Sequence, residues 1–170
     1  MTRAAVFGCG IDVEELARFD RYVGAGNDSL VRGICSEREF AALRRGDARA
    51  RFALSFCCKE AFFKALGASW TNSEVSWRDI ELLFCGPGLR ECEVRLYGRA
   101  RDIVTANRLR VGEAVCGCND VYALFQVVLV AEDAEAGPGA DGGSCGREGD
   151  DEPLCWPRCR AIRAGREGST

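Results

Sequence analysis

The sequence of 170 residues contains no histidine, and only two of its 23 basic residues are lysines, Lys59 and Lys64. It has no run near the roughly 18 to 20 apolar residues that span a bilayer. Its first ten residues contain too short an apolar stretch for a signal peptide. These absences predict a cytoplasmic protein that does not insert into a membrane.

Eleven cysteines are present, but no C-x-x-C pair. Structural zinc sites usually use such pairs, often with histidine, and disulfide frameworks belong to exported proteins. We therefore interpret Cys57, Cys58, Cys85 and Cys92 as reduced residues in or near the core. The pattern C-G-C at 116–118 and the pattern C-x-x-x-C at 155–159 leave a second interpretation open, a thiol-rich metal or redox protein.

The composition changes near residue 131, which predicts one domain over 1–130 and a tail over 131–170. The tail contains eight glycines and nine acidic residues, and its large apolar residues are only Leu154, Trp156 and Ile162. Such a segment buries too little surface to offset the entropy of ordering, so we expect it to be unstructured. The domain itself is left with a charge of about +1, too small to indicate nucleic-acid binding.

Strands and helices are both predicted within the domain. Strands are expected at 4–10, 77–85, 92–97, 114–118 and 121–130, with a tight turn at 119–120. Helices are expected at 12–22, 36–43, 47–66 and 98–109, where 36–39 is a capping box, Asp47 an N-cap and Gly67 a C-terminal stop. Because these elements mix without a regular βαβ repeat, the expected fold class is α+β.

Asp12 follows the first predicted strand, in the stretch G-C-G-I-D-V-E-E at 8–15. A structural interpretation makes Asp12 a helix cap, Glu15 its capping-box partner and Glu14 a partner of Arg18. In the functional interpretation, a strand that ends in small residues places the Asp12 carboxylate at the start of a helix, where it can act in a site. The residues alone leave both open.

Glu60 and Lys64 stand four residues apart on the longest predicted helix, where an ordinary surface salt bridge is one interpretation. Phenylalanines and Cys57 make this helix apolar on nearly every other side, so we expect it to be mostly buried. Because a buried Lys–Glu pair costs desolvation energy, its position favours a functional role.

Two stretches carry a resemblance to a known family. Residues 10–18, G-I-D-V-E-E-L-A-R, resemble the first signature of holo-(acyl-carrier-protein) synthases, G-(I/T)-D-(I/V)-x-E-(I/L)-x-R. Residues 56–67, F-C-C-K-E-A-F-F-K-A-L-G, resemble the second, F-(A/S)-x-K-E-A-x-x-K-A-(F/L)-G. I-C-S-E-R-E at 34–39 and W-R-D-I-E at 77–81 match further positions in the family's order. Over about residues 5–130 the chain is similar to these small 4′-phosphopantetheinyl transferases.

The resemblance implies a small antiparallel sheet packed with a long central helix, and an enzyme that moves 4′-phosphopantetheine from coenzyme A to a carrier-protein serine. Adenosine 3′,5′-bisphosphate is the other product. Asp12 and Glu60, one from each of two helices, would hold Mg²⁺. Glu60, or a metal-bound water beside it, would accept the serine proton, and Lys64 would bind a phosphate oxygen. Lys64, Gly67 and Asn119 occupy the positions that contact coenzyme A.

Partners are implied in the same way. Arg18, with Arg21 three residues later, would dock the acidic acyl carrier protein, and the enzyme would be a homotrimer with its active sites between subunits. Lys59 is expected to anchor its helix. Whether the carrier serves fatty-acid, polyketide or another synthesis is left open.

The pattern also departs from the family. Residues 116–119 are C-G-C-N where S-(I/V/L)-(S/T)-H is usual, Ser55 stands in the place of an arginine, and the turn at 86–88 lacks the usual lysine. These changes remove anion-binding groups but leave Asp12 and Glu60. We therefore expect an enzyme with a high KM for coenzyme A. The alternative is a relative that binds a carrier protein or nucleotide without transferring anything.

Overall fold

The computed structural model describes residues 5–23, 28–68, 74–86, 89, 91–131, 153–156 and 160–161. Its elements in chain order are β1 (Ala5–Glu15), the 3-10 helix η1 (Leu16–Phe19), α1 (Asp28–Ile34), α2 (Glu37–Leu43), α3 (Ala48–Ala65), the 3-10 helix η2 (Trp77–Asp79), β2 (Ile80–Phe84), β3 (Cys92–Leu96), α4 (Gly98–Ala106), β4 (Leu109–Cys118), β5 (Tyr122–Ala131), β6 (Leu154–Trp156) and β7 (Arg160–Ala161). No helix in these described ranges is long and apolar enough to cross a membrane.

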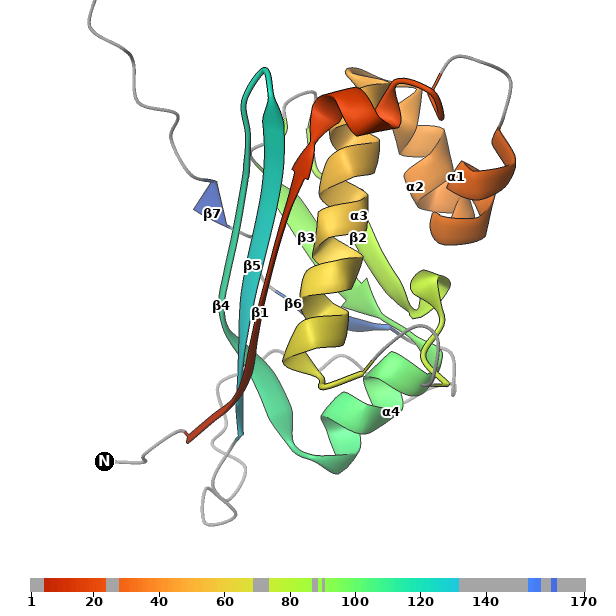
Figure 1. The fold of residues 1–170 in the computed structure, drawn as a ribbon. Coiled ribbons are helices and arrows are strands. Elements are labelled where there is room, and N and C mark those ends of the chain that lie inside the picture. Colours follow the sequence, from red (N-terminus) through yellow and green to blue (C-terminus); the bar gives the residue numbers. More distant parts are fainter. Residues whose placement is uncertain are drawn as a thin grey trace, which may run out of the picture.

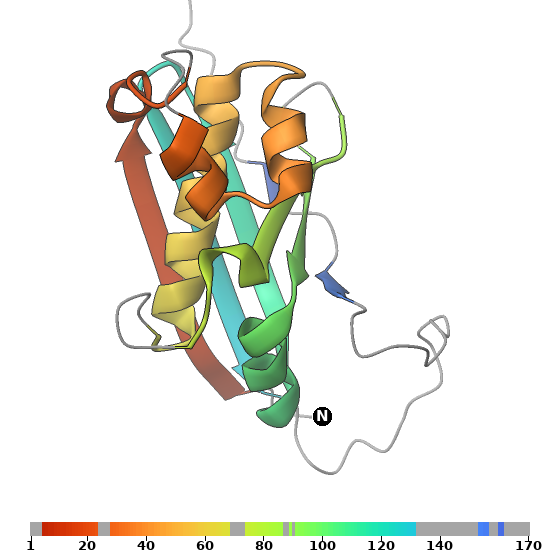
Figure 2. The same ribbon diagram turned by 90° about the vertical axis from the view of Figure 1, so that its right-hand side faces the viewer.

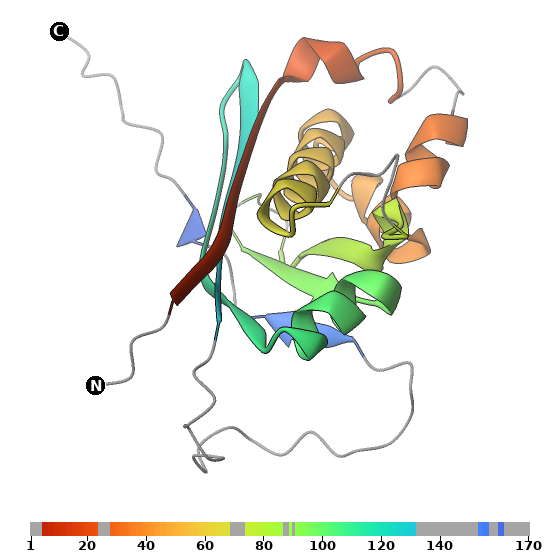
Figure 3. The same cartoon turned by 60° about the horizontal axis from the view of Figure 1, so that its bottom comes forward.

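Helix α3 is the centre of the fold. It packs against β1 and β5 of a sheet ordered β1-β5-β4-β7, and against β2 of a second sheet ordered β2-β3-β6. Figures 1 and 3 show α3 between the two sheets, and Figure 2 shows α1 and α2 beside its N-terminal half. Thirteen of its 18 residues are buried. The predicted α+β fold with a long central helix is confirmed.

The prediction of a helix over 12–22 is wrong. Strand β1 continues to Glu15 and pairs with β5 along its length, and only Leu16–Phe19 form a 3-10 turn. Asp12 therefore lies inside a strand and caps no helix. The apolar spacing was misleading because Val13 faces outward from the sheet, whereas Leu16 and Phe19 of the 3-10 turn are buried.

Most other boundaries agree with the predictions. Ser36 and Glu39 form the capping box at the start of α2, Asp47 caps α3, and Gly67, with a φ of 64°, follows its end. The predicted strand over 77–85 begins with η2 and becomes extended only at β2. Helix α1 was not predicted, because seven residues give too short an apolar pattern.

Two glycines allow β1 to lie directly against α3. A Cβ on Gly10 would stand 1.8 Å from the carbonyl oxygen of Ala61, and a Cβ on Gly8 would stand 2.0 Å from that of Ala65. Any side chain at these positions would push the strand away from the helix. The close approach carries the next inward-facing residue of β1, Asp12, to the surface of α3.

The described part of the tail forms two short strands. β6 pairs antiparallel with β3, and β7 pairs parallel with β4 at Val115 and Cys116. Leu154 packs half-buried against the core, which gives this segment apolar contacts that the overall composition of the tail does not indicate. For the other residues after Ala131, which lie outside the described part, an unstructured tail stays a prediction.

The cysteines follow the prediction with one exception. Cys57, Cys58 and Cys92 are buried, whereas Cys85 is exposed because it follows β2 at the start of a turn. The nine cysteines in the described ranges form no disulfide with one another. Those ranges contain no group of three or more His, Cys, Asp or Glu side chains placed to hold a metal, and Cys159 lies outside them.

Candidate active site

Asp12 lies on the inner face of β1, against α3. Its Oδ1 accepts a hydrogen bond from Lys64 Nζ at 2.7 Å, and the same ammonium donates to the carbonyl oxygen of Ile11 at 2.9 Å. Its Oδ2 is buried and has no hydrogen-bond partner among the described residues. A buried carboxylate oxygen without a partner is costly, so a cation placed beside it would be stabilising.

Glu60 comes from α3, one helical turn before Lys64. Burial raises the pKa of the Glu60 carboxyl, and the negative charge of Asp12 raises it further, against the opposing effect of Lys64. The two carboxylates therefore lie close enough to repel each other. Lys64 is joined to Asp12, so the simple Glu60–Lys64 surface pair weighed from the sequence is not the arrangement found.

Together these residues place two carboxylates and one ammonium in the same region. Two carboxylates, one with an unpartnered oxygen, supply the oxygen ligands that Mg²⁺ prefers, and they leave positions for phosphate and water. Lys64, with about half of its side chain exposed, adds a positive charge at the same place. The structure brings Asp12, Glu60 and Lys64 together from a strand and a helix rather than from two helices, and their roles toward Mg²⁺ and phosphate stay predictions.

Lys59 has a different environment, although it is adjacent to Glu60. It is fully buried and pairs with Glu39 Oε2 at 2.9 Å; it also donates to the carbonyl oxygens of Trp77 and Ile80. The other oxygen of Glu39 accepts from Ser55 Oγ and from the backbone N–H of Leu82. This network joins α2, α3 and β2, so Lys59 anchors its helix as expected and faces away from the carboxylate site.

An apolar pocket of about 410 Å³ opens beside Glu60. We call it the Glu60 pocket; the other residues that line it are Arg18, Phe19, Tyr22, Leu30, Ile34, Phe52, Phe56 and Trp77. The Phe56 and Trp77 rings are stacked 5.3 Å apart and form one wall. Sequence reasoning missed this pocket, although both rings belong to the matched motifs, because their contact depends on how η2 crosses α3.

The two arginines expected to bind a partner lie at the same end of the molecule. Arg18 lines the Glu60 pocket, with its guanidinium carbon 5.1 Å from the centre of the Phe56 ring, and it also pairs with Glu14. The pair with Glu14 that was weighed from the sequence is present, and the docking role of Arg18 stays a prediction. Arg21 instead stacks on Tyr22, at 4.7 Å from the ring centre.

Gly67 and Asn119 do not join this cluster. Gly67 follows the C-terminal end of α3, whereas Asn119 lies in the β4–β5 turn at the opposite end of the sheet (Figure 1). The Asn119 side-chain oxygen accepts from the backbone N–H groups of Val121 and Tyr122, so it closes the turn. A contact of either residue with coenzyme A stays a prediction.

Comparison with known proteins gives a family from the sequence and a shared fold from the structure. The family model of the 4′-phosphopantetheinyl transferase superfamily matches residues 8–110. A holo-(acyl-carrier-protein) synthase of Geobacter sp. strain M21 is 36% identical over 100 residues, which cover 58% of this chain and 77% of the relative. That of Geobacter sulfurreducens is 34% identical over 128 residues, which cover 73% and 97%.

A solved structure shares the fold. The crystal structure of a holo-(acyl-carrier-protein) synthase from Bacillus anthracis, in complex with CoA (3′,5′-ADP), aligns with a TM-score of 0.53. It is 23% identical in sequence, and the alignment covers 76% of this chain and all of the other.

Proposed function

The chain belongs to the 4′-phosphopantetheinyl transferase superfamily, and on that premise we propose that it is a holo-(acyl-carrier-protein) synthase. It transfers the 4′-phosphopantetheine group of coenzyme A to a serine of an acidic acyl carrier protein and releases adenosine 3′,5′-bisphosphate. The observation that carries the proposal is the meeting of Asp12 and Glu60 around an unpartnered carboxylate oxygen, with Lys64 beside them.

Asp12 and Glu60 are the residues that would hold Mg²⁺. The fit is supported by the buried, unpartnered Oδ2 of Asp12 and by the pKa of Glu60, which burial and, after it, the charge of Asp12 raise; a cation beside the two carboxylates would stabilise their charged forms. When bound, the ion neutralises pyrophosphate charge and polarises the phosphorus that is attacked.

The residues of the chain would take the remaining roles in transfer. Lys64 is a point charge that binds a phosphate oxygen of coenzyme A. Glu60 accepts the proton of the carrier serine. The serine oxygen bonds to the phosphorus next to pantetheine, the pyrophosphate P–O bond breaks, and adenosine 3′,5′-bisphosphate leaves with that bond's electrons.

The carrier would dock where Arg18 and the Glu60 pocket adjoin the carboxylates. Arg18 offers a cation to an acidic helix, and the aromatic wall of the pocket offers a place for an apolar side chain of that helix. Arg21, on the same surface, extends the positive charge. The serine is thereby brought within reach of Glu60.

We also propose that the active enzyme is a homotrimer. Strand β1 exposes apolar side chains on the outer face of the sheet, among them Phe7, Ile11 and Val13. Tyr122 of β5 is exposed as well. An apolar face of this kind is typical of an interface. Gly67 and Asn119 lie at opposite ends of one chain, so a coenzyme A site that uses both positions requires two copies.

Analytical ultracentrifugation tests this assembly. The wild-type protein is expected to sediment with the mass of three chains, and Val13→Glu, which places a charge on the exposed face, with the mass of one. Thr105→Glu, an exposed change on α4, is the matched control and should keep the trimer. A monomeric wild-type protein at micromolar concentration would contradict the proposal.

The experiment that tests the function is mass spectrometry of an apo acyl carrier protein incubated with this protein, Mg²⁺ and coenzyme A. A gain of one phosphopantetheine group is expected, and none on a carrier whose acceptor serine is replaced by alanine. The KM for coenzyme A should be high, because Ser55 and the residues at 116–119 replace anion-binding groups of the family. No gain with several carriers at millimolar coenzyme A would favour the non-catalytic alternative.

A further inference from the structure

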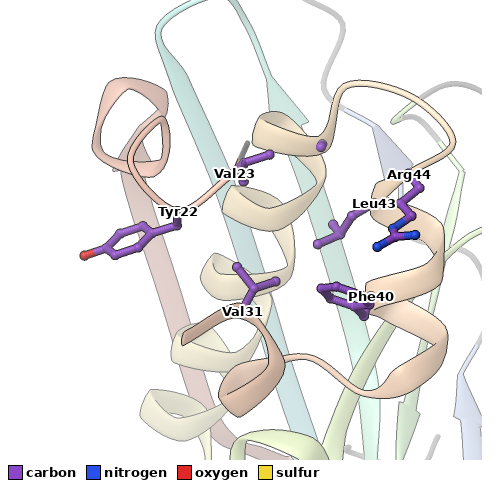
Figure 4. Close-up of a pocket in the computed structure, with 7 residues that line it drawn as sticks. Tyr22, Val23, Val31, Phe40, Leu43 and Arg44 are labelled. Atoms are coloured by element: carbon purple, nitrogen blue, oxygen red, sulfur yellow. The ribbon is translucent and has the colours of Figure 1, made fainter. Parts of the chain in front are cut away.

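A second, smaller pocket of about 160 Å³ lies between α1, α2 and the segment that follows η1. Figure 4 shows the side chains of Val31, Phe40 and Leu43 directed at one space, with Val23 above it and the Arg44 guanidinium at its edge. We call it the Phe40 pocket. No step of the transfer reaction uses it.

The rim of this pocket is positively charged. The guanidinium carbons of Arg32 and Arg44 lie 3.9 and 5.5 Å from the centre of the Phe40 ring. Arg32 is about half exposed, and its nearest acid, Glu37, is 3.9 Å away in an exposed and therefore weak pair. An apolar cavity with cations at its edge is complementary to an apolar side chain that has carboxylates beside it.

The Phe40 pocket is continuous with the docking surface proposed above. Tyr22 lines both pockets and stands between them, with its ring turned away from Phe40 in Figure 4. Arg18 borders the first pocket, and Arg44 borders the second. An amphipathic acidic helix that places one apolar side chain in the Glu60 pocket can extend along this surface to a second anchor, the mode in which apolar anchors at helical spacing bind a groove.

We propose that the Phe40 pocket is a second anchoring site for the carrier protein, which takes one apolar side chain while Arg44 and Arg32 bind the carboxylates beside it. The proposal rests on the proposed transferase function only for the identity of the partner. Binding at this site orients the carrier on the enzyme and also adds affinity, because two anchored side chains fix the direction of a bound helix and one does not.

The test measures binding of a fluorescently labelled apo acyl carrier protein, separately from transfer. Arg44→Glu is expected to raise the Kd and the KM for the carrier about fivefold to tenfold at low salt, and to leave the KM for coenzyme A unchanged. Arg45→Glu is the matched control, since it makes the same charge change on an adjacent exposed residue that does not line the pocket. Ala48→Phe fills the pocket without changing charge and should weaken binding as well. Circular dichroism establishes that each variant is folded.

Several results would overturn the site. Equal effects of Arg44→Glu and Arg45→Glu would indicate general attraction rather than a pocket, and full affinity in Ala48→Phe would show that the cavity is unused. A changed sedimentation mass for Arg44→Glu would assign the pocket to contact between copies. Wild-type protein that binds the carrier through the pocket without transferring the group contradicts the proposed function alone, whereas absence of carrier binding contradicts both proposals.

Discussion

Glu60→Gln is expected to lower the rate of phosphopantetheine transfer by at least about a thousandfold, while the protein stays folded. The amide has nearly the shape of the carboxyl, but it neither accepts the serine proton nor offers a charged oxygen to a cation. Loss of a positioned general base alone costs roughly 10²–10⁴ in rate, and loss of a metal ligand adds to it. The rate is measured by mass spectrometry of the carrier at saturating coenzyme A.

The structure supplies a control and a second measurement for this variant. Glu15→Gln makes the same chemical change on the outward face of β1, three residues from Asp12, and should leave the chemical step unchanged. Mg²⁺ should raise the melting temperature of the wild-type protein and of Glu15→Gln but not that of Glu60→Gln, because ligand binding stabilises only a protein that retains the site. If Glu60→Gln transferred the group as fast as Glu15→Gln, the assignment of Glu60 as base and ligand would be wrong.

The pairing of Asp12 with Glu60 was implied by the resemblance of two short stretches to the family's signatures, each of which has a fixed spacing. Glu60 and Lys64 are one helical turn apart on any helix that contains both, and the Asp47 cap and Gly67 stop defined that helix correctly. Asp12 was assigned to the site although its secondary structure was mistaken. A carboxylate two residues after the packed Gly10 reaches α3 from a strand as well as from a helix end.

The error at 12–22 has a physical cause. β1 is a strand because it forms a ladder with β5, which is more than a hundred residues away. A local sequence pattern does not contain this contribution. Val13 was therefore fitted to a helix facing the core, although it faces outward.

Contacts between distant segments could not be predicted from the sequence either. The Glu60 pocket requires Phe56 and Trp77 to stack, and the partner of Lys64 turned out to be Asp12, 52 residues earlier. The Phe40 pocket depends on α1, whose seven residues gave no clear signal. Spacing within one helix is fixed by its geometry, whereas the register between elements is fixed by packing.

Lys59→Met is expected to give the largest loss of stability, about 3–5 kcal/mol in the free energy of unfolding. Lys59 is fully buried against Glu39, whose oxygens also accept from Ser55 and Leu82. Methionine matches the length of the lysine but leaves the Glu39 carboxylate buried without its cation, and the carbonyl oxygens of Trp77 and Ile80 lose a donor. Urea denaturation measures the change, and a fall of about 10 °C in melting temperature should accompany it.

The second lysine of the chain is the natural control for this argument. Lys64 is about half exposed in its pair with Asp12, so Lys64→Met should cost no more than about 1 kcal/mol of stability although it impairs transfer. Adding Glu39→Gln to Lys59→Met removes the uncompensated charge and should recover part of the loss, because the two residues interact directly and their effects are not additive. If the double variant were less stable than Lys59→Met, the cost would lie in packing rather than in an unpaired charge. That result would contradict the roles that the geometry indicates, in which Lys59 stabilises the fold and its neighbour Glu60 acts in transfer.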